Sequence, residues 1–135
     1  GLSKVDKNGW TPAHCASSKG HEGVLKILVQ YAPGTFRAVD KNGWTPAHYA
    51  SFKGHAGVLE ILAQHALETL SAKDADGTTP VHWAAVEGHV RALEVLVKKV
   101  LIALQKMHME RRQLIMQLLD TTKYVQSLLL CGLKK

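Results

Sequence analysis

Histidine and cysteine are the residues of this sequence best suited to chemistry. The chain has eight histidines and two cysteines, and both types bind zinc or act as acid, base or nucleophile in enzymes. Two histidines, His65 and His108, have no partner at ligand spacing. The other six recur every 34 residues, which indicates a structural role in each copy of a repeated unit: His14, His48 and His82, and His21, His55 and His89. We therefore expect no metal site and no cofactor.

The cysteines do not indicate catalysis either. Cys15 and Cys131 lie 116 positions apart, without a CxxC spacing. Cys15 follows His14, but adjacent residues of a helix do not face each other, so we expect a buried, inert thiol. The sequence also lacks GxSxG, HExxH, GxGxxG and phosphate-loop motifs. We therefore expect that the protein is not an enzyme.

A nine-residue stretch occurs twice, and an edited copy follows. "DKNGWTPAH" stands at residues 6–14 and 40–48, and "DADGTTPVH" at 74–82. A period of 34 residues indicates stacked units, each of which needs a neighbour to cover its apolar face. The letters predict a tight turn, a Thr-capped helix with Pro in its first turn and Gly at its end, and then a second helix. These positions are Asn8-Gly9, Asn42-Gly43 and Asp76-Gly77 for the turns, Thr11, Thr45 and Thr79 for the caps, and Gly20, Gly54 and Gly88 for the helix ends.

The second helix of each copy carries the strongest apolar pattern, which predicts a core shared between units. Its residues are Val24, Leu25, Ile27 and Leu28, then Val58, Leu59, Ile61 and Leu62, then Val90, Leu93, Val95 and Leu96. Small residues in the first helices would let the helices approach closely: Ala13, Ala16, Ala47, Ala50, Ala84 and Ala85.

The stretches "TPAHCA", "TPAHYA" and "TPVHWA", each followed by Gly-His and an apolar helix, resemble the ankyrin repeat. The resemblance covers residues 4–97 and implies an all-α helical repeat solenoid with short hairpin loops. It also implies that the signature His hydrogen-bonds the signature Thr and neighbouring backbone. The chain departs from the T-P-L-H-x-A signature, because Ala or Val replaces Leu, and its period is 34 where about 33 is usual. We expect a longer loop in "YAPGTFRAVD" and "HALETLSAKD".

We expect a single domain over residues 1–135, with repeats at about 5–38, 39–72 and 73–99 and a divergent helical cap at about 100–135. Residues 90–131 contain no Gly or Pro, so the last repeat helix could run on as one long helix. Arg111, at the centre of the apolar face, favours a break instead. That alternative is a helix to about residue 109 and then an antiparallel helix pair that closes the stack. Gly1 in place of Met, and the absence of helices before the first repeat, favour a piece of a longer protein.

Composition and charge exclude some classes of protein. A hydrophobic content of 46% with 21% charged residues is ordinary for a globular protein, and no apolar span or signal peptide is visible. We expect an intracellular, cytoplasmic location and no stable membrane insertion. The net charge of +6 lies in residues 98–135, which hold 8 basic and 2 acidic residues, against 9 of each before them. Aromatic residues do not interleave this basic segment, so we expect no nucleic-acid partner.

Three interpretations of the basic segment are open. It could be the solvated face of a cap, it could be attracted to an acidic surface, or the C-terminal helices could self-associate through Ile102, Met109 and Met116. The resemblance itself implies a non-enzymatic protein–protein interaction module that binds through the hairpin tips and the concave face of the first helices. The alternative is a targeting or scaffold fragment of a larger protein whose basic C-terminal helix contacts an acidic protein or membrane surface.

Partner-binding residues follow from the register of the repeats. Trp10 and Trp44 are of the type enriched in interaction hot spots, although each indole could instead pack over its own hairpin. The predicted partner-binding residues are Lys7, Asn8, Trp10, Lys19, Lys41, Asn42, Trp44, Phe52, Lys53, Asp76, Thr78 and Glu87.

Overall fold

The computed structural model describes residues 5–133. Residue 4, at the start of the ankyrin resemblance, and residues 134–135, at the end of the predicted cap, lie outside this range. Contacts divide the chain into two units, residues 1–101 and residues 102–135, which are described separately. Within residues 5–133 every regular element is a helix.

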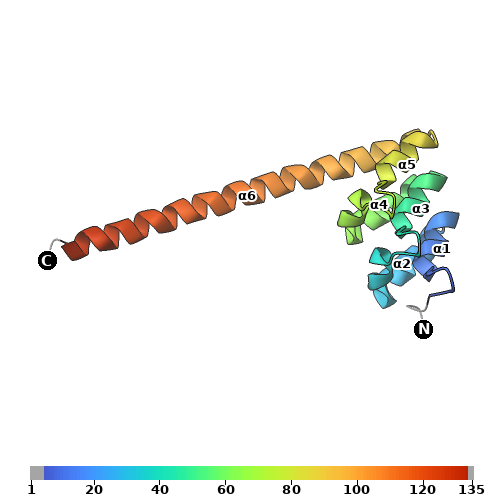
Figure 1. Cartoon of the computed structure of the whole chain (residues 1–135), viewed down its shortest axis with the longest axis horizontal. Helices are drawn as coiled ribbons and strands as arrows, with labels where there is room; N and C mark the ends of the chain where they lie inside the picture. The colour runs from blue at the N-terminus through green and yellow to red at the C-terminus, as the bar shows by residue number, and fades with distance from the viewer. Residues whose placement is uncertain (1–4, 134–135) are drawn as a thin grey trace. The chain divides into compact units, whose positions relative to one another are not determined.

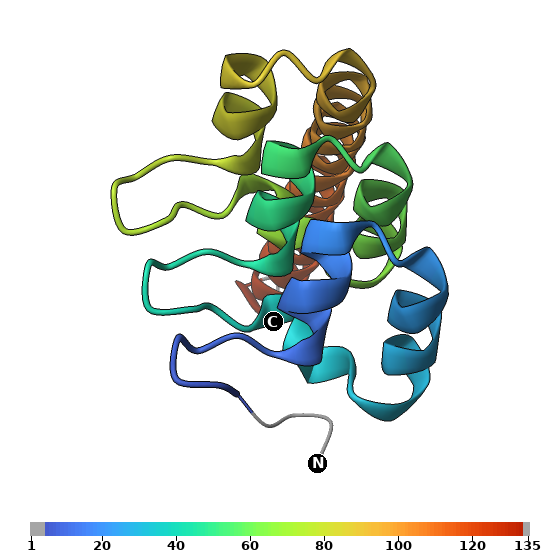
Figure 2. The ribbon, with the colours of Figure 1, turned by 90° about the vertical axis from the view of Figure 1, so that its right-hand side faces the viewer.

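Unit 1 is a stack of helix pairs (Figure 1). The first helices are α1 (Pro12–Lys19), α3 (Pro46–Lys53) and α5 (Pro80–Val86), and α3 packs against both of the others. The second helices are α2 (Glu22–Tyr31), α4 (Ala56–His65) and residues 90–101 of α6 (Val90–Leu133). Figure 2 shows hairpin loops, first helices and second helices as three rows. The predicted all-α helical repeat solenoid is confirmed.

The first helices begin where the sequence predicts. Each starts with Pro directly after its Thr N-cap, and in α1 and α3 the Thr side chain accepts the backbone N–H at the third helical position. Gly20 and Gly54 are the left-handed C-caps of α1 and α3. In the third repeat α5 ends one residue earlier, with Glu87 as its C-cap and Gly88 after it. A Thr N-cap of this kind contributes about 0.5–2 kcal/mol to stability.

Some of the predicted core residues are buried only where a neighbouring repeat packs against them. Val58 and Ile61 of α4 are buried, since the first repeat packs on them. Val24 and Ile27 occupy the same positions of α2 and are 43% and 57% exposed, so their prediction as core was wrong.

Among the remaining predicted core residues, Val90 is also exposed, while Leu93 and Val95 are partly buried. Ala85 is exposed as well. The other predicted apolar and small residues are buried: Leu25, Leu28, Leu59, Leu62, Leu96, Ala13, Ala16, Ala47, Ala50 and Ala84.

The connections between repeats are short 3₁₀ helices rather than the predicted longer loops. They are η1 (Pro33–Arg37) and η2 (Leu67–Ser71). In each, a buried Thr donates its hydroxyl to a carbonyl three residues earlier, at 2.7 Å. Phe36 and Leu70 on these turns are fully buried. The extra residue of the period is therefore absorbed into a compact turn that contributes a side chain to the core.

Helix α6 corrects the predicted break near residue 109 and the antiparallel pair after it. It is continuous from Val90 to Leu133, which is the other alternative that the sequence left open. The hydroxyls of Thr121 and Thr122 donate to carbonyls four residues earlier, at 2.9 Å, instead of capping a new helix. Arg111 is exposed, so its charge does not force a break. In unit 2, every residue whose side chain is described is exposed except the partly buried Ala103.

Candidate functional site

The hairpin tips are built alike in all three repeats. In the first, Asp6 Oδ1 accepts the N–H groups of Asn8 and Trp10, both at 2.9 Å. Asp40 and Asp74 make the corresponding pairs of bonds, also at 2.9 Å. An acceptor inside each turn therefore fixes the loop, while the side chains at its outer end take no part in holding it.

Main-chain hydrogen bonds join the tips in a row. The N–H of Lys41 donates to the Asn8 carbonyl and that of Ala75 to the Asn42 carbonyl, both at 3.1 Å. Gly43 has a φ of +76°, and a Cβ there would stand 2.8 Å from the Ala75 nitrogen. Close backbone approach and the left-handed conformation both require glycine at this turn.

The signature histidines join each first helix to its own cap and to the next repeat. His14 Nδ1 accepts the Thr11 N–H at 3.1 Å and lies 3.0 Å from the Thr11 hydroxyl. Its other ring nitrogen, Nε2, must then carry the proton, and it lies 2.8 Å from the Trp44 carbonyl. His48 repeats this arrangement with Thr45 and, at 3.0 Å, with the Thr78 carbonyl. Burial lowers the pKa of both His14 and His48.

The other recurring histidines also have structural bonds. His82 caps α5 with its Nδ1 2.8 Å from the Thr79 hydroxyl. His55 and His89 reach back to the carbonyls of Ser18 and Phe52 at 3.0 and 2.9 Å. The structural role predicted for the recurring histidines is thus confirmed for five of the six. His21 is exposed at the first repeat, which has no preceding repeat within the described residues.

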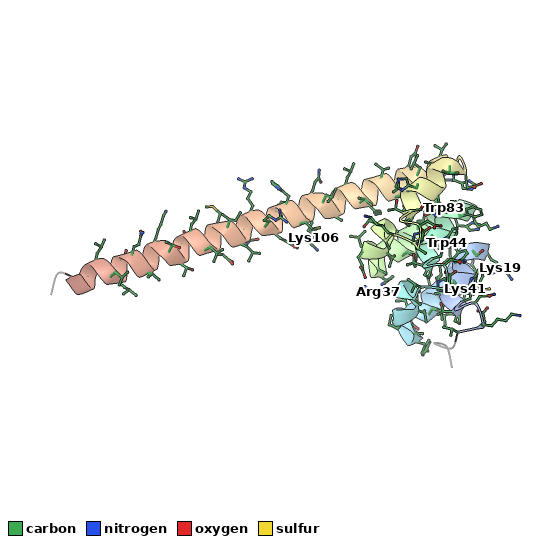
Figure 3. The ribbon with its side chains drawn as sticks, viewed as in Figure 1. Lys19, Arg37, Lys41, Trp44, Trp83 and Lys106 are labelled. Atoms are coloured by element: carbon green, nitrogen blue, oxygen red, sulfur yellow. The ribbon has the colours of Figure 1, made fainter. Side chains whose placement is uncertain are left out.

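Five aromatic residues form a continuous cluster beside the tips, which we call the aromatic strip: Trp10, Trp44, Tyr49, Phe52 and Trp83. Ring centroids lie 4.7 Å apart for Trp10 and Tyr49, 4.8 Å for Tyr49 and Trp44, and 4.9 Å for Trp44 and Trp83. All five side chains are half-buried. Figure 3 shows Trp44 and Trp83 with Lys19 and Lys41 on one side of the stack and Arg37 on the other.

Polar groups fix the rings of the aromatic strip. The Trp10 indole N–H donates to the Tyr49 hydroxyl at 3.1 Å, and that hydroxyl donates to Asp40. The Trp83 indole donates to Asp74 at 3.2 Å. Burial, followed by the bond to Asp40, raises the pKa of Tyr49, so its hydroxyl stays protonated. The strip is therefore an ordered apolar surface with no free acid or base.

A cavity of about 350 Å³ opens on the aromatic strip. Four of the five rings line it, together with Ser18, Asn42 and Lys53. The Lys53 ammonium stands 5.5 Å from the Phe52 ring centroid. The site thus combines flat apolar walls with one positive charge and two uncharged polar groups.

The predicted partner-binding residues all lie at the tips, on the aromatic strip or at the ends of the first helices. Trp10, Trp44, Phe52 and Thr78 are half-buried, while Lys7, Asn8, Lys41, Asn42, Asp76, Lys19, Lys53 and Glu87 are exposed. Their role in binding stays a prediction. Trp10 packs on Tyr49 of the next repeat, and not only on its own helix.

Sequence reasoning missed Tyr49 and Trp83. Both occupy the position after the signature His, where the first repeat has Cys15. That position varies between copies while its neighbours repeat, which was an available signal for a surface role. Cys15 itself is only half-buried, so the expectation of a buried thiol holds in part.

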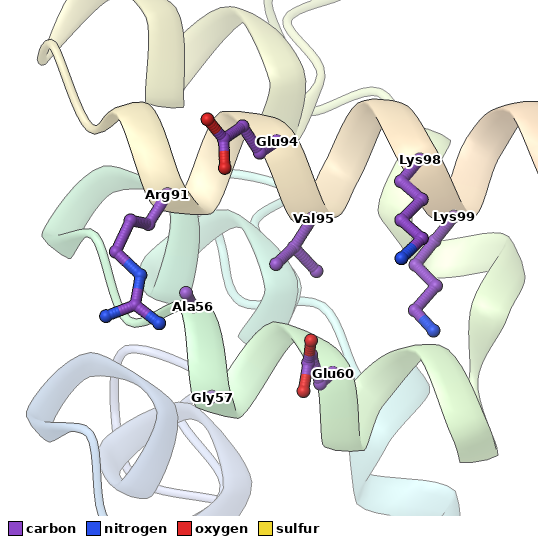
Figure 4. A pocket seen from close by; sticks show the side chains of 8 residues that line it. All are labelled: Ala56, Gly57, Glu60, Arg91, Glu94, Val95, Lys98 and Lys99. Carbon is purple, nitrogen blue, oxygen red and sulfur yellow. The ribbon is translucent and has the colours of Figure 1, made fainter.

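A second cavity, of about 310 Å³, lies between α4 and the start of α6 (Figure 4). Its lining is mostly charged: Glu60, Glu94, Arg91, Lys98 and Lys99 beside Ala56, Gly57 and Val95. It has two acidic and three basic side chains, so it presents no single sign of charge. Residues 5–133 hold no group of three or more His, Cys, Asp or Glu side chains placed to bind a metal.

The fold and the site define a helical repeat protein with variable side chains on a repeated frame. Comparison with protein families agrees: a family described as ankyrin repeats in three copies matches residues 1–74 and 33–107. The chain belongs to the ankyrin repeat family, whose members are generally protein–protein interaction modules. A search of curated proteins gave no match. Among the described helices, none is long and apolar enough to cross a membrane.

Proposed function

We propose that this protein is a non-enzymatic module that binds a partner protein through its hairpin tips and the concave face of α1, α3 and α5. The observation that carries this proposal is the aromatic strip. Five half-buried rings with a cavity stand beside exposed tip side chains such as those of Lys7 and Lys41. Aromatic side chains of this kind are enriched among binding hot spots.

The rigidity of the frame supports binding at this face. Each tip is fixed by an aspartate and joined to the next by a main-chain bond, so little ordering is required when a partner binds. Less ordering leaves more of the contact energy available as affinity.

The titratable groups of the site support a role without catalysis. His14 and His48 are fully buried, and each ring is hydrogen-bonded to the Thr N-cap of its own helix and to a backbone carbonyl of the next repeat. The Tyr49 hydroxyl donates a hydrogen bond to Asp40. We extend the proposal to an intracellular, cytoplasmic location and to binding without a cofactor.

Matched variants test the binding face once a partner has been captured and purified. Lys7→Ala with Lys41→Ala changes only exposed tip side chains, and Trp44→Ala removes the centre of the aromatic strip. Lys26→Ala with Glu60→Ala removes two exposed charges from the second helices and serves as the control. We expect Trp44→Ala to weaken binding at least tenfold, about 1.4 kcal/mol, and the tip pair to weaken it less.

Melting temperatures separate binding from folding in this experiment. The tip pair and the control should melt like the parent, because none of the four side chains is buried. Equal loss of affinity in the control and the tip pair would mean that the tips contribute no more than the second helices, which would contradict the proposed binding face.

A second candidate function rests on unit 2. Lys106, Arg112 and Lys123 are exposed there beside exposed apolar residues such as Met109 and Met116. We propose, as the alternative, that this basic helix contacts an acidic protein or membrane surface. Flotation with anionic and with neutral liposomes at low and high salt tests it, since an electrostatic contact weakens as salt rises. Equal flotation with both lipids would contradict it.

A further inference from the structure

The charge around the aromatic strip differs between the repeats. Lys7 and Lys41 stand at the first two tips, and Lys19 and Lys53 end α1 and α3, all four exposed. In the third repeat the equivalent positions are Ala75 and Glu87, and Asp76 replaces the tip asparagine. The third repeat therefore lacks both lysines and has two carboxylates in this region, and its one lysine here is Lys73 at the base of the hairpin.

The aspartates of the first two hairpins cancel only part of the charge of these four lysines. Asp40 is buried and accepts three hydrogen bonds, from two backbone N–H groups and the Tyr49 hydroxyl. Asp6 is exposed, but its Oδ1 accepts two backbone N–H groups. Since four lysines stand against these two carboxylates, the tips and first helices of repeats one and two keep a net positive charge.

The cavity on the aromatic strip fits a single side chain. Its volume of about 350 Å³ lies near the lower end of the range for small-ligand sites. An organic cation would gain from the rings but would meet the Lys53 ammonium at the cavity wall. An aromatic group gains from the rings and meets no like charge.

The geometry of the rings disfavours single-stranded nucleic acid. Neighbouring rings are inclined by between 48° and 74°. Each ring therefore packs its edge or a tilted face on the next, and the strip offers no series of open, parallel faces on which successive bases could stack.

We propose that this face binds an extended acidic segment of a partner protein that carries one aromatic side chain. The aromatic side chain enters the cavity on the aromatic strip, and the carboxylates lie over the lysines of repeats one and two. The carboxylates of Asp76 and Glu87 repel like charge, so the acid-free end of the segment lies over repeat three. This inference rests on the proposed function and adds the chemistry of the partner.

The test begins with a random peptide library selected on the full chain. A synthetic acidic peptide with one central Phe is then compared with versions in which Lys replaces the acids or Gly replaces Phe, and with a single-stranded oligonucleotide. Fluorescence polarisation measures each affinity at low and high salt. We expect the acidic Phe peptide to bind roughly tenfold tighter than either variant peptide, and less tightly as salt rises.

Two charge-reversal variants locate the contact. Lys41→Glu with Lys53→Glu should weaken the acidic peptide by roughly tenfold, while Lys106→Glu, an exposed control in unit 2, should not. Tighter binding of the oligonucleotide or of the Lys peptide, or equal effects of the two variants, would overturn this inference.

The library separates failure of this inference from failure of the proposed function. Selected peptides of other composition that lose affinity in Trp44→Ala overturn the acidic partner and leave the binding face in place. Selected peptides that bind Trp44→Ala and Lys7→Ala/Lys41→Ala as tightly as the parent overturn both.

Discussion

Acid should destabilise this stack through two buried histidines. Burial lowers the pKa of His14 and His48 from an ordinary value of 6.5. A protonated ring would also lose the Nδ1 acceptor that receives the Thr11 or Thr45 N–H. Well above pH 6.5 both rings are neutral in either state, so the stability they give is fully present. As the pH falls below 6.5 the unfolded chain takes up protons first, and the free energy of unfolding decreases.

Linkage bounds the size of this effect. Between its unfolded and folded pKa, one histidine changes the free energy of unfolding by at most about 1.4 kcal/mol per pH unit. Two histidines together give at most about 2.7 kcal/mol per pH unit. This is a large share of the roughly 5–15 kcal/mol that holds a domain together.

Urea unfolding, followed by circular dichroism between about pH 5 and pH 7.5, measures this slope. The window lies above the ordinary pKa values of Glu68 and Asp74, 4.5 and 3.8, whose lowered pKa values affect stability only in more acidic solution. His48→Asn removes one titrating ring and should reduce the slope by about half. His82→Asn is the matched control, because His82 caps α5 in the same way but is exposed.

Equal slopes for the parent, His48→Asn and His82→Asn would refute the reasoning. A direct readout is the NMR titration of the His48 ring in the parent protein, which does not depend on the variant folding. Its midpoint should lie below 6.5, and a midpoint at or above 6.5 would contradict the role of burial.

Three further predictions concern the frame. Gly43→Ala should lower the unfolding free energy by more than Gly77→Ala, which we expect to cost about 1 kcal/mol, because both have positive φ but only the Cβ at 43 would meet backbone, at 2.8 Å; equal costs would contradict the close tip contact. Leu59→Ala, at a fully buried site, should cost about 2–5 kcal/mol in urea unfolding, and less than 1 kcal/mol would mean a loosely packed core. Thr121→Ala with Thr122→Ala should increase helicity by circular dichroism, since Ala is the better helix former, and a decrease would indicate that the two hydroxyl bonds support α6.

The repeat frame could be predicted from the sequence because its signals are local. Thr11 with Pro12 and Asn8 with Gly9 specify a cap and a turn through their own side chains or backbone preference. The burial of individual apolar residues could not be predicted in this way. Val24 and Val58 have the same local pattern, and only the presence of a packed neighbour distinguishes the exposed one from the buried one.

The candidate site was predicted in part for a related reason. The register gave Trp10 and Trp44, but the aromatic strip also depends on Tyr49, which packs on Trp44 within the second repeat and on Trp10 of the first repeat. Contacts between repeats cannot be predicted when the sequence of each repeat is considered separately. For α6 the sequence left two alternatives open, and the break favoured by Arg111 is the one that the structure contradicts. Arg111 is exposed, and residues 90–131 contain no Gly or Pro to interrupt the helix.

The main-chain bonds between hairpin tips have a consequence for how such a protein can change over time. The Lys41 N–H and the Asn8 carbonyl would meet whatever side chains those residues carried. Main-chain atoms of the tip residues therefore hold the repeats together, while side-chain atoms of the same residues are available for recognition. Over evolution such a protein could exchange one partner for another by substituting a few exposed tip residues, with almost no loss of stability of the repeat stack.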